Sequence, residues 1–229
     1  MEQASIPGTI PYFLKEQIRR SIIDGTFRPG QPLREQDLER RYGSSRGPIR
    51  EALRLLEQSG LVTHIQRRGF RVTLYSEREI RDMYLLRAEL QSYTMLRLGE
   101  IDDLKPLLKE MNECHQRMAS AFEARNVGQY VQEIRNFYDA SSGFLGNKPL
   151  QDTLNRLYET AEPLRFNLLS RRLDKSRSLQ YTRKIMQALK ARDFPLAAAL
   201  KREHVLMNLP SIVETYMEAI YEDTEARTG

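Results

Sequence analysis

The stretch GSSRGPIREALRLLEQSGLV, residues 43–62, carries a complete set of signals for one short helix. Ser45 is a favourable N-cap, and Pro48 lies in the first turn, where its missing N–H would have had no partner within the helix. Gly60 is placed to end the helix. These signals predict a helix that begins at Arg46 and stops before Gly60.

This helix has two different faces, because successive side chains are about 100° apart. Apolar side chains share the first face: Ile49, Leu53 and Leu56. Arginines line an adjacent face: Arg46, Arg50 and Arg54. The apolar face is predicted to pack inward, which leaves the arginine face free to meet a partner.

The residues on either side complete a small module. Two strands are predicted over 61–66 and 70–74, joined through the basic turn 67–69. Helices are predicted over 11–24, with Ile18, Ile22 and Ile23 facing inward, and over 35–42. Two helices, a sharp turn, a basic helix and a hairpin form a winged helix-turn-helix, whose last helix lies in the DNA major groove. The alternative is a generic three-helix core.

Positive charge is concentrated in the first third of the chain. Residues 1–75 contain 13 Lys and Arg against 8 Asp and Glu, whereas residues 76–229 contain 23 of each. Positive charge concentrated in one domain suits specific contacts with DNA phosphates. A non-specific polycation would instead carry its positive charge along the whole chain. We therefore predict a DNA-binding domain over 1–75 and a second domain over 76–229.

The first domain resembles the DNA-binding domain of GntR-type bacterial transcription regulators. The residues that carry the resemblance are RPG at 28–30, LRE at 33–35, Leu38, YG at 42–43, SR at 45–46, PIREALRLL at 48–56, GLV at 60–62 and RGFRV at 68–72. The resemblance implies that three elements meet DNA: the recognition helix, the helix before it and the wing. The implied contact residues are Gln36, Ser45, Arg46, Gly47, Arg50, Gln66, Arg67, Arg68 and Gly69.

The sequence indicates different roles for the individual contact residues. Arg46 is expected to bind guanine O6 and N7 in a bidentate way, and Arg50 either does the same or anchors a phosphate. For Arg67 and Arg68, a DNA contact and plain solvated charge remain alternatives, and Arg54 is expected to pair at the surface. The family usually has threonine at the position of Gly47, so one hydroxyl contact is missing and the preferred operator is expected to differ.

The second domain has helical patterning throughout and no hairpin signal. The predicted helices cover 77–99, 102–125, 127–145, 148–172, 175–192 and 194–222. The expected fold class is mainly α, with the winged helix-turn-helix followed by an all-α six-helix bundle. Pro163 and Pro210 lie inside two of these ranges and are expected to kink or break them.

Localisation follows from what the chain lacks. No window of about 18 apolar residues and no signal pattern at the start are present, which predicts a cytoplasmic protein without a membrane segment. The single cysteine, Cys114, fits a reducing compartment.

This domain is similar to the ligand-sensing FCD domain of the FadR-like branch. The similarity rests on the helix count, on Phe137 followed by Gly146 and Asn147, and on the last helix with His204. Many members of that branch hold a divalent metal through one Asp and three His. Spacing places the corresponding positions on Ile134, Tyr138, Thr182 and His204. A lone imidazole is a poor metal site, so no metal and no other cofactor is predicted.

The same positions lie on inward faces of their helices, which leaves Tyr138, Thr182 and His204 as polar groups in a core. They either satisfy one another or bind a ligand. Arg87 shares the inward face of its own helix, and a buried arginine needs an anion. An internal acid such as Glu89 or Glu133 is the alternative to a ligand. The predicted effector site is Arg87, Tyr138, Thr182 and His204, for a small organic acid or acyl-type anion.

Together these features predict a transcription regulator, acting as a repressor, that binds a short inverted-repeat operator as a homodimer and responds to this effector. No catalytic motif is present, so an enzyme is not expected. Two alternatives remain: a constitutive dimeric DNA-binding protein whose bundle is a dimerisation scaffold, and a metal-sensing regulator.

Overall fold

The computed structural model describes residues 9–171 and 176–228, and it divides the chain into two compact units with the boundary between Tyr75 and Ser76. The N-terminal unit contains three helices and a small sheet: α1 (Ile10–Ile23), β1 (Pro32–Leu33), α2 (Glu35–Tyr42), α3 (Arg46–Gln58), β2 (Val62–Ile65) and β3 (Gly69–Val72). The expected winged helix-turn-helix is confirmed.

The turn between α2 and α3 depends on Gly43. This residue ends α2 with φ 62°, in the left-handed region that glycine adopts without a steric penalty. Ser45 is at the N-cap of α3, as predicted, but its side chain makes no capping hydrogen bond. The buried face of α3 contributes Ile49, Leu53 and Leu56 to the core of this unit, which leaves its arginine face exposed.

The sheet has one strand that the sequence did not predict. Its order is β1-β3-β2, with both pairings antiparallel, and β1 pairs Pro32 and Leu33 with Arg71 and Phe70. A two-residue strand gives no alternating pattern, so only tertiary pairing reveals it. The predicted hairpin is present but shorter than expected.

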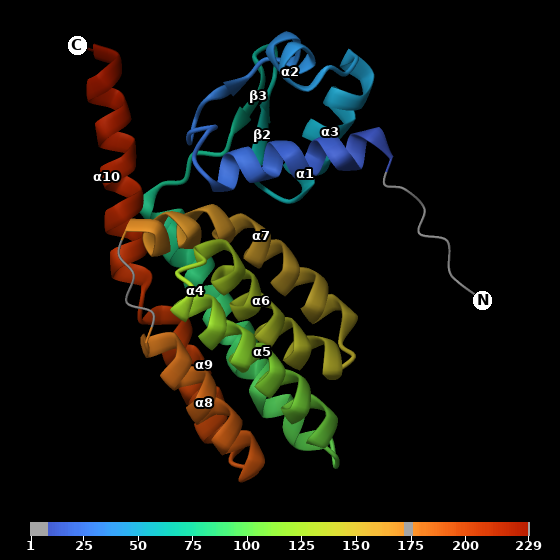
Figure 1. Ribbon diagram of the computed structural model, residues 1–229, viewed down its shortest axis with the longest axis vertical. Coiled ribbons are helices and arrows are strands. Elements are labelled where there is room, and N and C mark those ends of the chain that lie inside the picture. Colours follow the sequence, from blue (N-terminus) through green and yellow to red (C-terminus); the bar gives the residue numbers. More distant parts are fainter. Residues whose placement is uncertain (1–8, 172–175, 229) are drawn as a thin grey trace. The chain divides into compact units, whose positions relative to one another are not determined.

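The C-terminal unit consists of helices packed side by side (Figure 1). They are α4 (Glu77–Arg97), the 3-10 turn η1 (Leu98–Glu100), α5 (Lys105–Glu123), α6 (Val127–Phe144), α7 (Lys148–Arg171), α8 (Ser176–Lys190), α9 (Phe194–Leu206) and α10 (Leu209–Thr228). The mainly α class is confirmed. The range predicted as one helix over 194–222 is divided into α9 and α10 just before Pro210, whereas Pro163 lies inside α7 without ending it.

Helix α4 is the centre of this unit, because it packs against α6, α7, α9 and α10 (Figure 1). It begins with a capping box, in which the Ser76 hydroxyl accepts from the Glu79 N–H and the Glu79 carboxylate accepts from the Ser76 N–H. Its buried face nevertheless carries polar side chains, Arg87, Gln91 and Thr94. In the described ranges, no helix is both long and apolar enough to cross a bilayer.

Candidate functional site

The first candidate site is the exposed N-terminal end of α3, where two arginines share one acidic partner. Glu35, at the start of α2, receives hydrogen bonds from Arg50, Nε to Oε1 at 2.8 Å and Nη2 to Oε2 at 3.1 Å. Arg46 Nε also donates to Glu35 Oε2. The hydrogen bond from Arg50 and then that from Arg46 lower the pKa of the Glu35 carboxyl. Glu35 therefore orients both guanidinium groups while leaving them exposed.

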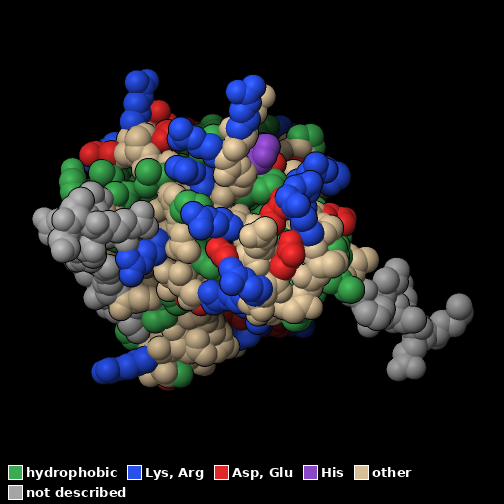
Figure 2. All heavy atoms as spheres, turned by 90° about the horizontal axis from the view of Figure 1, so that it is seen from above, with side chains coloured by type: hydrophobic (Ala, Val, Ile, Leu, Met, Phe, Trp, Pro, Cys, Tyr) green, Lys and Arg blue, Asp and Glu red, His purple; other side chains and the backbone are tan. Residues whose placement is uncertain are grey.

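The nine residues predicted to contact DNA all have exposed side chains or backbone in this unit. Their distribution follows the elements: Gln36 is on α2, four lie at the start of α3, and the range 66–69 forms the wing tip. Figure 2 shows a face on which Lys and Arg side chains are more extensive than Asp and Glu side chains. An exposed cationic face of this kind is suited to the phosphate backbone of DNA.

The wing tip has an unusual backbone at one position. Arg67 has φ 64°, a left-handed conformation uncommon for residues other than glycine, and Gly69 follows with φ 79°. The Arg68 N–H donates to the carbonyl oxygen of Ile65 at 2.9 Å, which closes the turn. A tight turn of this kind presents the Arg67 and Arg68 side chains at the end of the hairpin.

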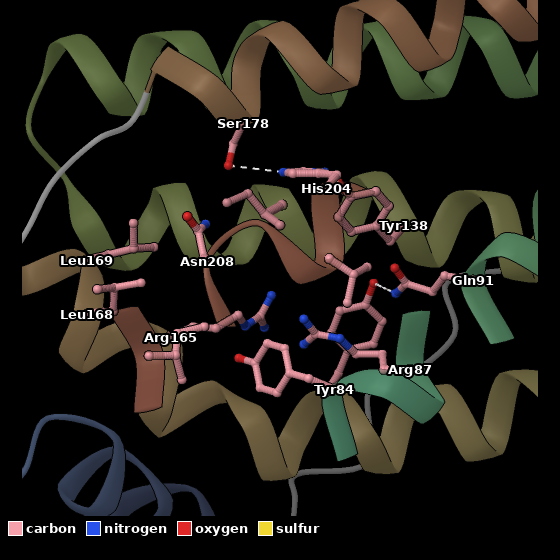
Figure 3. Close-up of a pocket in the computed structure, with 14 residues that line it drawn as sticks. Tyr84, Arg87, Gln91, Tyr138, Arg165, Leu168, Leu169, Ser178, His204 and Asn208 are labelled. Atoms are coloured by element: carbon pink, nitrogen blue, oxygen red, sulfur yellow. Dashed lines mark hydrogen bonds between the residues drawn. The ribbon is translucent and has the colours of Figure 1, made fainter. Parts of the chain in front are cut away.

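The second candidate site is a cavity inside the helical unit (Figure 3). Its volume is about 50 Å³. The lining mixes polar groups with an apolar wall: Tyr84, Arg87, Gln91, Ile134, Tyr138, Tyr158, Arg165, Leu168, Leu169, Ser178, His204, Val205, Asn208 and Ile212. These residues come from α4, α6, α7, α8, α9 and α10, and Asn208 comes from the link between α9 and α10, so the cavity exists only when the bundle is assembled.

Arg87 enters this cavity, as the sequence predicted that it would enter the bundle. It is 5% exposed, and its guanidinium carbon lies 4.1 Å from the centroid of the Tyr84 ring. Within the described part of the chain, Arg87 Nε and Nη1 have no hydrogen-bond partner. A buried guanidinium with free N–H groups is suited to an oxygen anion.

The two acids named as possible partners of Arg87 are engaged elsewhere. Glu89 accepts from Arg202 Nε at 2.6 Å, and Glu133 accepts from Arg117 Nε at 3.0 Å. The contacts of these two acids therefore argue against a salt bridge between Arg87 and either of them.

His204 is held by two hydroxyl groups. Its Nδ1 bonds to the Tyr138 hydroxyl, and its Nε2 bonds to the Ser178 hydroxyl at 3.1 Å (Figure 3). Burial, followed by the positive charges of Lys201, Arg87 and Arg165, holds the pKa of His204 well below its ordinary range. The imidazole is consequently neutral, and it faces the cavity together with Tyr138.

Thr182 does not join the other three residues of the predicted effector site. It is fully buried on α8, but it is absent from the cavity lining, and its hydroxyl bonds to His115 Nδ1 at 2.8 Å and donates to the carbonyl of Leu179 at 3.0 Å. Ser178, one helical turn earlier, is the α8 residue that reaches His204. The one-turn difference depends on how α8 and α9 are rotated against each other, which spacing along the chain does not determine.

Two buried basic side chains were not among the residues predicted for this site. Arg165 on α7 is 9% exposed and lines the cavity, and Lys201 on α9 is 1% exposed with Nζ over the Tyr138 ring. Burial is the main cause that lowers the pKa of both groups, and the positive charge of Arg87 lowers it further. The spacing of Tyr158, Arg165 and Leu169 along one face of α7 was the available signal.

These residues do not fit the divalent metal site that the FCD resemblance implies. Both nitrogens of His204 are engaged with hydroxyl groups, and Lys201 places an amine against the same Tyr138 ring. No cluster of three His, Cys, Asp or Glu side chains suited to a metal occurs among the described residues. Positive side chains occupy this region, and they favour an anion over a cation.

Two family models match the sequence, one in each unit. The model described as bacterial regulatory proteins, gntR family, matches residues 13–72, and the model of the FCD domain matches residues 82–206. Relatives among characterised proteins include the HTH-type transcriptional repressor GlaR of Escherichia coli strain K12. It is 30% identical over 210 residues, which cover 85% of this chain and 92% of GlaR.

Further similarities agree with this pair of matches. The gluconate operon transcriptional repressor of Bacillus subtilis strain 168 is 26% identical over 184 residues, 77% of this chain and 74% of that repressor. Among solved structures, McbR/YncC of E. coli superposes with a TM-score of 0.76 at 19% identity, covering 92% of this chain and all of that one. At this identity the structural likeness supports the fold alone.

Proposed function

This chain belongs to the GntR family of bacterial transcription regulators and carries an FCD domain, and we propose that it is a repressor whose operator affinity is set by a small organic anion. The coarse activity, DNA binding by a transcription regulator, follows from family membership. The proposal adds the sign of regulation, the effector class and the residues. Its placement in the FadR-like branch, its action in the cytoplasm and its homodimeric state are part of the same proposal.

Arg46 and Arg50 are the proposed base-reading residues. Both are exposed at the start of α3, the position from which a recognition helix reaches base edges in the major groove. Glu35 holds both guanidinium groups from α2, which reduces the conformational freedom lost on binding. Two such helices in a homodimer would meet the two halves of a short inverted repeat.

The observation that carries the effector part is that two nitrogens of the buried Arg87 guanidinium have no hydrogen-bond partner among the described residues. Its Nε and Nη1 lack partners within residues 9–171 and 176–228, and the acids near it in sequence are bound to other arginines. Leaving a buried charged group unpaired is costly. An acidic effector that bonds Arg87, with Tyr138 and His204 beside it, relieves that cost.

Regulation requires the effector to prefer one of the DNA-binding states of the dimer. An anion that binds the helical unit more tightly in the state with low operator affinity releases the operator. The same coupling predicts that operator DNA weakens effector binding by the same factor. Repressor names among the relatives support this sign.

The test is a footprint of the purified protein on the intergenic DNA beside its own gene, at a stated salt concentration. A protected inverted repeat is the expected result, and protection should weaken when the effector is added. Uniform or absent protection on that DNA would contradict the operator proposed here. Protection that no organic anion changes would favour a constitutive DNA-binding protein with a scaffold bundle.

A further inference from the structure

The cavity contains a second arginine for which the proposed function does not account. Arg165 comes from α7, two residues after Pro163, and lines the same cavity as Arg87. Figure 3 shows the two guanidinium groups pointing toward one another. Their central carbons lie 5.3 Å and 5.6 Å from the centroid of the same Tyr158 ring. Two like charges from different helices therefore meet in one small space.

Arg165 has open N–H groups, as Arg87 has. Its Nε and Nη2 have no hydrogen-bond partner in the part of the chain that the structure describes. Two acids act on this region, but both contact Arg135: Asp139 at 3.3 Å and Glu162 at 3.7 Å. Neither carboxylate accepts a hydrogen bond from Nε or Nη2 of Arg165.

Lys201 is a third buried basic side chain, behind the cavity wall. Its Nζ lies over the ring of Tyr138, whose other neighbours include His204, and it has no hydrogen-bond partner among the described residues. The positive charge of Arg87 lowers the pKa of both Arg165 and Lys201, whereas Glu162 raises that of Arg165 and Asp139 raises that of Lys201. A single carboxylate would balance only one of the two cavity arginines.

We infer that this cavity binds a small dianion, clamped between the guanidinium groups of Arg87 and Arg165. The inference rests on the proposed function and specifies its effector: two negative charges, or one phosphate-like group, rather than a simple monocarboxylate. Each guanidinium presents a planar pair of N–H donors, and two such pairs facing each other match the oxygens of a phosphate group or of a short dicarboxylate.

Two further buried polar groups indicate which other groups the ligand carries. The Tyr84 hydroxyl and Gln91 Oε1 are buried without partners within the described ranges, while Gln91 Nε2 donates to the Tyr158 hydroxyl. Gln91 Oε1 is an acceptor, so it requires a donor such as a ligand hydroxyl. The volume of about 50 Å³ favours a small molecule, and the apolar wall on α7 tolerates a short carbon chain.

The first experiment compares probe anions in the absence of DNA. Thermal unfolding and calorimetric titration are measured with inorganic phosphate, sulfate, malonate, acetate and chloride at matched ionic strength. At a hundredfold excess over the Kd, a bound dianion should raise the Tm by about 5–10 °C. Acetate and chloride should shift it by less than about 1 °C, since each leaves one arginine unbalanced.

The relative affinities of the dianions distinguish a tetrahedral oxyanion from a dicarboxylate as the ligand. Stronger binding of phosphate and sulfate than of malonate would assign a tetrahedral oxyanion, and the reverse order would assign a dicarboxylate. Equal stabilisation by acetate and by every dianion would overturn the inference. The absence of any anion effect on the wild-type protein would overturn it as well.

The variant experiment uses Arg165→Met, with Arg156→Met as a matched control on the exposed face of the same helix. Arg165→Met should weaken binding of the preferred dianion at least tenfold and abolish the preference over acetate. Its Tm in chloride buffer should equal or exceed that of the wild type, because one of several like charges is removed. The control should bind like the wild type. A second variant, Arg165→Lys, keeps the charge and should retain part of the preference.

Failure of this inference is distinguishable from failure of the proposed function. A protein that protects its operator but binds dianions no better than acetate would refute only the inference that the effector is a dianion. A protein that binds dianions tightly but protects no operator would refute the regulatory proposal and leave the anion site in place.

Discussion

Arginine occurs in two contrasting environments in this chain. At the start of α3, Arg46 and Arg50 are exposed and share Glu35. In the helical unit, Arg87 and Arg165 are buried, and two nitrogens of each have no hydrogen-bond partner among the described residues. Water solvates an exposed guanidinium at little cost, so an exposed arginine needs no partner to persist. A buried one does need a partner, and its free N–H groups therefore indicate a ligand.

The comparison also explains why the two sites differ in how readily they are recognised. The arginines of α3 act from one short helix, so their spacing reveals their common face. The cavity groups come from six helices, and their meeting depends on how those helices pack. The exposed site is therefore encoded locally, and the buried site is encoded by the assembled bundle.

The largest expected effect concerns the exposed arginines. Arg46→Ala should weaken operator binding by about 1–3 kcal/mol, because a bidentate base contact is lost, and should weaken binding to random DNA much less. Binding is measured on both DNAs at one salt concentration. Arg54→Ala, on the same helix and also exposed, is the control and should change neither affinity appreciably. Equal losses on both DNAs would contradict a base-reading role for Arg46.

The next prediction tests whether Thr182 belongs to the buried site. Thr182→Val should lower the free energy of unfolding by about 1–2 kcal/mol, because His115 loses its hydroxyl partner in a buried region. Anion binding should remain that of the wild type, since Thr182 does not line the cavity. Chemical denaturation and calorimetry measure the two quantities.

Thr153→Val is the matched control for that change. Its hydroxyl is exposed and donates only to a carbonyl of its own helix, so the free energy of unfolding should change by less than about 0.5 kcal/mol. A loss of anion binding in Thr182→Val, without a loss of stability, would return Thr182 to the effector site.

A smaller effect is expected at the wing. Arg68→Ala should weaken binding to all DNA sequences about equally and reduce the slope of log K against log salt by about 0.9, as the loss of one phosphate contact requires. The measurement is a salt titration on operator and random DNA. An unchanged slope would identify Arg68 as solvated charge, the alternative that the sequence left open.

The smallest effect is a pH dependence at Glu35. Because Arg50 and then Arg46 lower the pKa of this carboxyl, the ion pair stabilises the folded state above the ordinary glutamate pKa. This contribution is lost as the pH falls through the lowered value. An NMR titration of the labelled carboxyl should place its midpoint below the usual range in the wild type and closer to it in Arg50→Met. A midpoint that does not move in that variant would show that Arg50 does not hold Glu35.

Much of the fold was predictable because its signals are local. The helix over 35–42 and the start of α3 at Arg46 follow from glycine, proline and apolar spacing, and the wing follows from two short runs around a basic turn. The strand at Pro32–Leu33 was not predictable, because two residues carry no periodicity. The break before Pro210 was anticipated as a kink or a break, and the structure resolves it as a break.

The two candidate sites likewise differ in whether local sequence or tertiary packing determines them. The sequence determined by itself that this chain has a basic recognition helix, a wing and a helical second domain with a buried arginine, since each follows from residues close together in the chain. Only the tertiary structure decided that Arg165 joins Arg87 in the cavity and that Lys201 lies over the Tyr138 ring, while Thr182 bonds to His115 instead. The physical reason is that helix rotation and packing, which arise from contacts far apart in sequence, determine which inward side chains meet.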